Sequence, residues 1–170
     1  MHVIRAGHAM TVARPIRAAL LTLLLTGASR GIGHATVKRF SSAGWRVITC
    51  SRHPFPEDCP WEAGPEDHIQ IDLGDPTSTM EAVAEIRSRL KSGKLEALVN
   101  NAGITGKISQ VRDMSEAAIL EVMQLNVIGL MLCCREAVRR MSKKDGGAGG
   151  AVVNLSSIAS RLGSPNEFTH

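Results

Sequence analysis

One glycine-rich segment, TGASRGIG at residues 26–33, constrains the fold of this chain more than any other feature. It directly follows the apolar run Leu20–Leu25, a pattern typical of a strand that is buried on both faces. After the glycines comes a loose helical stripe of apolar residues, formed by Ile32, Ala35, Val37 and Phe40. The stripe ends at Gly44, which suits a left-handed helix cap. The order strand, glycine turn and helix predicts the first unit of an α/β fold.

The rest of the chain continues this alternation. Strands are expected over 46–50, 69–73, 95–99 and 151–155, and helices over 76–93 and 115–141. Asp75 followed by Pro76 marks a helix start, because the aspartate can cap the first turn and proline suits the first helical position. The apolar face expected for that helix comprises Met80, Val83, Ile86 and Leu90. Helices of this length between strands imply parallel βαβ units joined by right-handed crossovers.

Length and composition exclude several classes of protein. The 170 residues suffice for one domain with a substantial core and are too few for two comfortable ones. The six histidines and four cysteines show no metal-ligand spacing, so no metal site is expected. Two Trp, three Phe and no Tyr leave few side chains on which bases could stack, which argues against a nucleic-acid partner.

The charge is distributed unevenly along the chain. The net charge is +4, and eight Lys and Arg residues precede Glu57, which is the first acidic residue. A basic amino-terminal half attracts anionic partners. A small ligand that carries phosphate would benefit from the same field.

Residues 1–19 are expected to form an amino-terminal extension to a single domain over 20–170. Arg14 and Arg17 precede an apolar run, as in a signal peptide, and the acid-poor stretch also resembles a transit segment. Cleavage near there would destroy the glycine motif, so we favour a frayed extension and a cytoplasmic location. We expect no apolar stretch to reach the ~20 residues of a membrane-spanning helix, and no membrane partner.

The spacing of the glycines favours a site for nucleotide phosphates. Gly27, Gly31 and Gly33 allow a tight turn, close approach of a pyrophosphate to the backbone and close packing of the helix. The N–H groups and the dipole at the start of that helix attract an anion. An ordinary glycine-rich turn is the alternative, and the position between a strand and a helix disfavours it.

The TGxxxGxG spacing resembles that of the short-chain dehydrogenase/reductase family. Further motifs of the family follow in the same order: NNAG over 100–103, NVxG over 126–129 and a serine after the last expected strand. Asp72, followed by Leu73, resembles the aspartate that contacts adenine in the family. The resemblance covers the chain from Leu20 to its end. It implies an α/β fold with a Rossmann-type doubly wound parallel sheet of strand order 3-2-1-4-5, incomplete because the family's carboxy-terminal strands and helices are missing.

The resemblance also implies a set of cofactor contacts. They are Gly27, Ser29, Arg30, Gly31, Ile32, Gly33, Arg52, Asp72, Leu73, Asn101, Ala102 and Gly103.

The choice of cofactor follows from charge. NAD enzymes place an Asp or Glu about twenty residues beyond the glycines to bind the ribose 2′-OH, whereas this chain has Ser51 and Arg52 there. Arg52 can hold a 2′-phosphate with its planar fork, and Arg30 adds a second positive charge. Either arginine alone could be a solvated surface residue. Their joint placement favours NADP(H).

The chemistry implied by the resemblance is hydride transfer between nicotinamide and a small-molecule carbonyl or alcohol. In the family a serine binds the carbonyl oxygen, a tyrosine acts as general acid or base beside a lysine, and a helix asparagine completes a proton relay. Ser157 matches the serine, with Ser156 as the alternative one residue earlier, and Asn126 matches the asparagine. The long helix over 115–141 resembles the family's subunit interface, which implies a homo-oligomer when the domain is complete.

The catalytic machinery is incomplete in this sequence. It contains no tyrosine and reaches His170 before any YxxxK motif. The usual separation of roughly thirteen residues from Ser157 falls on His170, and we favour a truncated, inactive domain over a substituted histidine. A non-catalytic dinucleotide-binding module is the rival hypothesis, and a fragment without function is the third.

Overall fold

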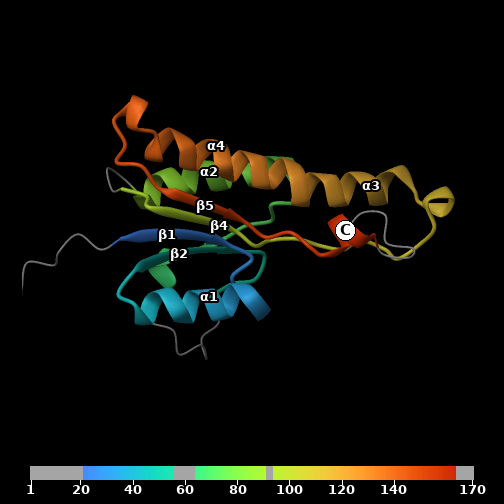
Figure 1. Cartoon of the computed structure of the whole chain (residues 1–170), viewed down its shortest axis with the longest axis horizontal. Coiled ribbons are helices and arrows are strands. Elements are labelled where there is room, and N and C mark those ends of the chain that lie inside the picture. Colours follow the sequence, from blue (N-terminus) through green and yellow to red (C-terminus); the bar gives the residue numbers. More distant parts are fainter. Residues whose placement is uncertain (1–20, 56–63, 91–93, 164–170) are drawn as a thin grey trace, which may run out of the picture.

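A five-stranded parallel sheet forms the centre of the computed structural model, which describes residues 21–55, 64–90 and 94–163 (Figure 1). Its strands are β1 (Thr22–Thr26), β2 (Arg46–Ser51), β3 (His68–Gln70), β4 (Ala97–Asn100) and β5 (Ala151–Asn154). They pair in the order β3-β2-β1-β4-β5, and every neighbouring pair is parallel. The doubly wound order expected from the sequence is confirmed. The extension over 1–19, Cys59 and His170 lie outside the described residues.

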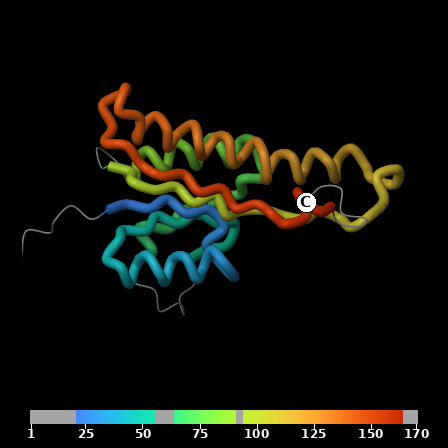
Figure 2. Tube along the Cα trace, in the orientation of Figure 1, coloured from blue at the N-terminus to red at the C-terminus, as the bar shows by residue number. Residues whose placement is uncertain are grey.

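Helices cover both faces of this sheet. Helix α1 (Gly31–Ser42) lies on one face, and α2 (Pro76–Leu90) and α4 (Leu130–Met141) lie on the other (Figure 1). Helix α4 continues α3 (Glu116–Met123) through a π-helical segment, η3 (Gln124–Gly129). Figure 2 shows the chain leaving the sheet after β4 and returning through this long helix. The short helices are η1 (Pro65–Asp67), η2 (Val111–Asp113), η4 (Lys143–Asp145) and α5 (Ala159–Leu162).

Two apolar cores hold the layers together, because successive residues of a strand point to opposite faces of the sheet. Leu24 and Leu98 lie in the core beneath α2 and α4. Leu23 and Leu25 lie in the other core, with Val37 of α1. No residue of β1 is more than 5% exposed, so this strand is buried on both faces as its apolar run predicts.

The helix boundaries expected from single residues are confirmed. Gly44 follows α1 with a φ of +80°, a conformation that glycine adopts at little cost. The Asp75 carboxylate accepts a hydrogen bond from the Ser78 N–H at 2.6 Å, and α2 begins at Pro76. Capping and proline chemistry therefore determine where this helix starts.

Three expected apolar positions are wrong, and one of them is Ala35 of α1, which is exposed. Met80 is 53% exposed, because the buried stripe of α2 runs back from Val83 to Thr79, about 100° around the helix from Met80. Ile32 is 67% exposed, because it lies in the first turn of α1, beside the glycine turn rather than over the sheet.

The third strand is shorter than expected and ends at Gln70 rather than Leu73. The Ile71 N–H still donates to the Ser51 carbonyl, but the chain then turns. At that turn an Asp72 carboxylate oxygen accepts the Gly74 N–H at 2.8 Å. A local side-chain hydrogen bond thus replaces the next pairing with β2.

The expectation that no segment is long and apolar enough to span a membrane is wrong for the helical run from Glu116 to Met141. It is 26 residues long and contains an 18-residue window with a mean hydropathy of 1.9, so it is long and apolar enough to cross a membrane; 22% of that window is buried. Its second half, α4, packs against β4 and α2. A helix that covers a sheet meets the same criterion, so length and composition do not by themselves indicate a membrane.

A buried carboxylate ties α2 to α4. Glu136 is 2% exposed and binds the Arg87 guanidinium at 2.8 Å and the Arg140 guanidinium at 3.3 Å. Burial alone would raise the pKa of Glu136, but its hydrogen bonds and charge interactions with the two arginines outweigh burial and hold the pKa below its usual value.

We expect Glu136→Gln to lower the melting temperature at pH 7 by about 3 to 8 °C, because the charged hydrogen bonds to both arginines are lost. The depressed pKa means that this stabilisation is present above the unfolded-state pKa of about 4.3 and is lost as pH falls through the folded-state value. The difference between the two proteins should therefore shrink below about pH 4, as measured by thermal unfolding monitored by circular dichroism. Glu85→Gln, which removes a half-buried pair with Arg89 on α2 alone, is the control. An equal effect of both substitutions would contradict the prediction.

Candidate functional site

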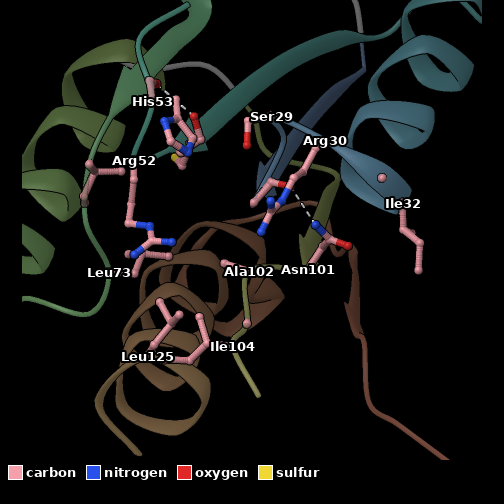
Figure 3. Close-up of a pocket in the computed structure, with 16 residues that line it drawn as sticks. Ser29, Arg30, Ile32, Arg52, His53, Leu73, Asn101, Ala102, Ile104 and Leu125 are labelled. Atoms are coloured by element: carbon pink, nitrogen blue, oxygen red, sulfur yellow. Dashed lines mark hydrogen bonds between the residues drawn. The ribbon is translucent and has the colours of Figure 1, made fainter. Parts of the chain in front are cut away.

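A pocket of about 280 Å³ lies where the carboxyl ends of β1, β2 and β4 meet (Figure 3). Chain segments leave β1 and β4 in opposite directions at this edge, and such a switch point is where open α/β sheets bind ligands. Of the cofactor contacts expected from the sequence, the pocket is lined by Gly27, Ser29, Arg30, Gly31, Ile32, Arg52, Leu73, Asn101, Ala102 and Gly103. Gly33 and Asp72 do not line it.

The glycine turn allows an unusually close approach of three chain segments. Gly27 and Gly31 have φ values of +67° and +56°. A Cβ on Gly33 would lie 2.1 Å from the Gly27 carbonyl oxygen, and a Cβ on Gly27 would lie 2.8 Å from the Ala102 backbone. Side chains larger than hydrogen cannot occupy these two positions without moving backbone.

Thr26 and Asn101 join the turn after β1 to the loop after β4. The buried Thr26 hydroxyl accepts the N–H groups of Asn101 and Ala102, each at 3.1 Å. In return the Asn101 side-chain amide donates to the carbonyls of Thr26 and Gly27, at 3.2 and 2.8 Å. The two loops that form the floor of the pocket are therefore held in one arrangement.

The start of α1 is suited to an anion. No side chain caps its first turn, and that turn contains no acidic residue. The first N–H groups of a helix carry a partial positive charge and have no intrahelical acceptor. Here they lie beside Gly31 and Ile32, which line the pocket.

Two arginines add positive charge to the same pocket. Arg30 from the glycine turn and Arg52 from the end of β2 are exposed, and both line the cavity (Figure 3). Within the part of the chain that the structure describes, neither guanidinium has a carboxylate partner. The Ser51 hydroxyl donates its proton to the His53 carbonyl, so toward a ligand it can act only as an acceptor.

Of the two residues after β3 that are expected to contact the cofactor, Leu73 faces the pocket, whereas Asp72 makes hydrogen bonds within its own turn. Leu73 lines the pocket. Asp72 uses a carboxylate oxygen to accept the Gly74 N–H, and its own N–H donates to the Ser78 hydroxyl at 3.2 Å. Contact of Asp72 with adenine stays a prediction.

Asn126 lies in the π-helical segment and binds the backbone of Ile104. Its amide donates to the Ile104 carbonyl at 2.7 Å, and its Oδ1 accepts the Ile104 N–H at 3.0 Å. Gly103 is close by, since a Cβ there would lie 3.4 Å from Asn126 Oδ1. The helix asparagine thus shapes the loop that begins with Asn101.

Ser157 and Ser156 follow β5 but do not line the pocket. The half-buried Ser157 hydroxyl accepts the Ala159 N–H at 3.2 Å. The exposed Ser156 lies 3.4 Å from the Ser160 hydroxyl. Neither contact identifies which serine would face a substrate, and both assignments stay predictions.

Several pocket residues were missed at the sequence level: Cys50, His53, Ile71, Ile104 and Leu125. Leu125 is an apolar residue of the expected long helix, but the periodicity of that helix does not show that Leu125 faces the pocket. Burial raises the pKa of Cys50, and burial with the neighbouring Cys134 raises the pKa of Cys133 to about 12, so both thiols stay protonated at neutral pH. No cluster of metal ligands occurs among the described residues.

Comparisons with known proteins agree with this geometry. The family model described as short chain dehydrogenase matches residues 21–169. The protein FixR of Bradyrhizobium diazoefficiens is 45% identical over 143 residues, which are 81% of this chain and 50% of FixR. This chain therefore spans about half the length of that relative.

Among solved structures of similar proteins, some contain NAD and others contain NADP. An oxidoreductase of the short chain dehydrogenase/reductase family from Brucella ovis, in complex with a partially ordered NAD, is 50% identical with a TM-score of 0.76. The match covers 86% of this chain and 67% of that one. ElxO with NADP bound is 26% identical with a TM-score of 0.72, over 88% of this chain and 60% of ElxO.

Replacing Thr26 by Val should destabilise the chain by roughly 2 to 4 kcal/mol, because two partly buried N–H groups lose their acceptor while the side-chain shape is kept. Urea unfolding followed by circular dichroism measures the change. Thr36→Val is the matched control, since the Thr36 hydroxyl donates to the Ile32 carbonyl within α1. A Thr26 variant as stable as the Thr36 variant would show that the link between the two loops is not needed.

Proposed function

The chain belongs to the short-chain dehydrogenase family, and from this membership we propose that it forms the cofactor-binding part of an NADP(H)-dependent oxidoreductase. The observation that carries the proposal is the joint presence of Arg30, Arg52 and an uncapped helix start around one pocket. These groups match an anionic dinucleotide, whose phosphates need N–H donors and positive charge.

The residues present fit this cofactor at both of its charged positions. Backbone N–H groups at Gly31 and Ile32 would hold the pyrophosphate, because the glycine turn leaves open space at Gly31. Arg52 and Arg30 would hold a 2′-phosphate, and the exposed position of both guanidinium groups leaves them accessible to it. The absence of a carboxylate at Ser51 removes the group that would select a ribose 2′-OH.

When bound, the nicotinamide supplies or accepts the hydride exchanged with a carbonyl or alcohol substrate. We propose that Ser157 donates a hydrogen bond to the substrate oxygen. Asn126 already holds the Ile104 backbone with its whole amide group. Asn126 would therefore contribute to a proton relay indirectly. It would keep the Ile104 backbone, and any water bound to that backbone, in position.

A second function is favoured by one observation, the absence of any tyrosine from the sequence. Without the proton donor that the family uses, the chain would bind NADP(H) as a non-catalytic module. Turnover separates the two functions: NADPH oxidation with a panel of ketones supports an enzyme, whereas binding without oxidation supports a module. We propose that the chain by itself binds without turnover, since positioned proton transfer contributes about 10²- to 10⁴-fold in rate.

We further propose a cytoplasmic protein that acts on a small carbonyl or alcohol and assembles as a homo-oligomer. Support for assembly comes from the long helix, which exposes apolar residues at helical spacing: Leu120, Met123, Val127, Met131 and Val138. Such a stripe is suited to burial against another helix.

Arg52→Asp should shift the cofactor preference toward NADH. The unsubstituted chain should bind NADPH at least tenfold more tightly than NADH, because one or two charged hydrogen bonds contribute about 1.5 to 3 kcal/mol each. The aspartate should remove this preference, because it repels the 2′-phosphate of NADPH and accepts a hydrogen bond from the ribose 2′-OH of NADH. Isothermal titration calorimetry with both nucleotides measures the two dissociation constants.

The control for net charge is Arg135→Asp, an exposed position of α4 on the opposite face of the sheet from α1 (Figure 1). It should leave the preference unchanged. Equal or tighter binding of NADH by the unsubstituted chain would overturn the charge argument.

In a longer protein that carries a YxxxK motif after this chain, Ser157→Ala should lower kcat by about 10²- to 10³-fold, as the loss of one donor to a developing oxyanion does. Ser156→Ala is the neighbouring control and should have a much smaller effect. Steady-state kinetics measures both variants. The reverse order would assign the catalytic role to Ser156.

A further inference from the structure

A row of four polar side chains crosses β2 and β3 beside the pocket, and one of them, Ser51, lines it. Thr49 pairs in register with His68, and Ser51 pairs with Gln70. Alternate residues of a strand share a face, so all four side chains lie on the face of the sheet that α1 covers. Thr49 and His68 are 1% and 8% exposed, so this polar row begins inside the protein.

His68 links the buried sheet to the loop after β2. Its Nε2 is 2.9 Å from the His53 carbonyl oxygen, which can only accept, so Nε2 carries the proton. In the neutral ring Nδ1 is then an acceptor for the Thr49 hydroxyl at 2.8 Å. The Ser51 hydroxyl donates to the same His53 carbonyl at 3.0 Å, so this oxygen has two donors.

Gln70 and Phe55 hold the loop at two further points. The Gln70 amide donates to the Arg52 carbonyl at 3.2 Å. The Phe55 ring packs edge-on against the His68 ring, with 5.9 Å between the ring centroids. In the loop from Arg52 to Phe55, three residues thus contact the side chains of His68 and Gln70 in β3.

We propose that His68 and Gln70 are positioning residues that determine the preference for NADPH, an inference that rests on the proposed function. They hold the backbone from which the Arg52 side chain reaches into the pocket. A long exposed side chain loses conformational entropy when it binds a phosphate, and a loop that is already ordered reduces this cost. NADH lacks the 2′-phosphate and gains nothing from the position of Arg52, so the effect is specific to one nucleotide.

The test measures the dissociation constants of NADPH and NADH for the chain with His68→Leu, Gln70→Leu and His68→Gln by isothermal titration calorimetry. The two leucine variants should weaken NADPH binding roughly three- to tenfold and change NADH binding less than twofold. His68→Gln keeps a donor within reach of the His53 carbonyl and should restore most of the NADPH affinity. Gln70 is exposed, so its variant decides the question if His68→Leu does not fold.

A double-mutant cycle separates positioning from general stability. In an Arg52→Ala background, Gln70→Leu and His68→Leu should change NADPH affinity less than twofold, because the group that they position is gone. Equal weakening of NADPH and NADH, an undiminished effect in the Arg52→Ala background or unchanged NADPH affinity in the leucine variants would each overturn the role. An unsubstituted chain without NADPH preference would overturn the proposed function and, with it, this role.

Discussion

The close approach of Gly27, Gly33 and Asn101 is the contact on which the site depends. A Cβ on Gly33 would lie 2.1 Å from the Gly27 carbonyl oxygen and 2.6 Å from the Asn101 amide. Only because that space is empty can α1 begin directly above the sheet, with its N–H groups turned toward the pocket. The Thr26 hydroxyl then holds the loop after β4 against the same turn. Fold and site share one set of short contacts, so neither can change without the other.

Around this rigid floor, charge and backbone have separate roles. Arg30 and Arg52 are exposed and reach the pocket without carboxylate partners among the described residues, so they can respond to an incoming anion. The backbone beneath them is held by buried or half-buried polar groups, such as His68 under the loop after β2 and Asn126 under the loop after β4. Because the backbone that carries these exposed charges is already held in place, binding of a phosphate does not have to order it.

Much of the fold follows from local chemistry in the sequence. Burial of β1, the start of α2 at Pro76 and the cap at Gly44 were all predicted, because apolar runs, capping side chains and glycine act over a few residues. The errors have a common cause. The end of β3 and the exposed faces of Ile32 and Met80 depend on what packs against each element, and periodicity does not contain that information.

The amino-acid sequence alone predicts the order of strands and helices and the glycine turn after the first strand. It also predicts Arg30 after β1 and Arg52 after β2 as binding residues. These features depend on residue type and spacing along the chain, which a linear pattern records. Packing in three dimensions is needed to bring Asn126 to the Ile104 backbone and His68 to the His53 carbonyl. Those contacts join residues 22 and 15 positions apart. They require the register of β2 with β3 and the course of the long helix, which arise when the layers pack.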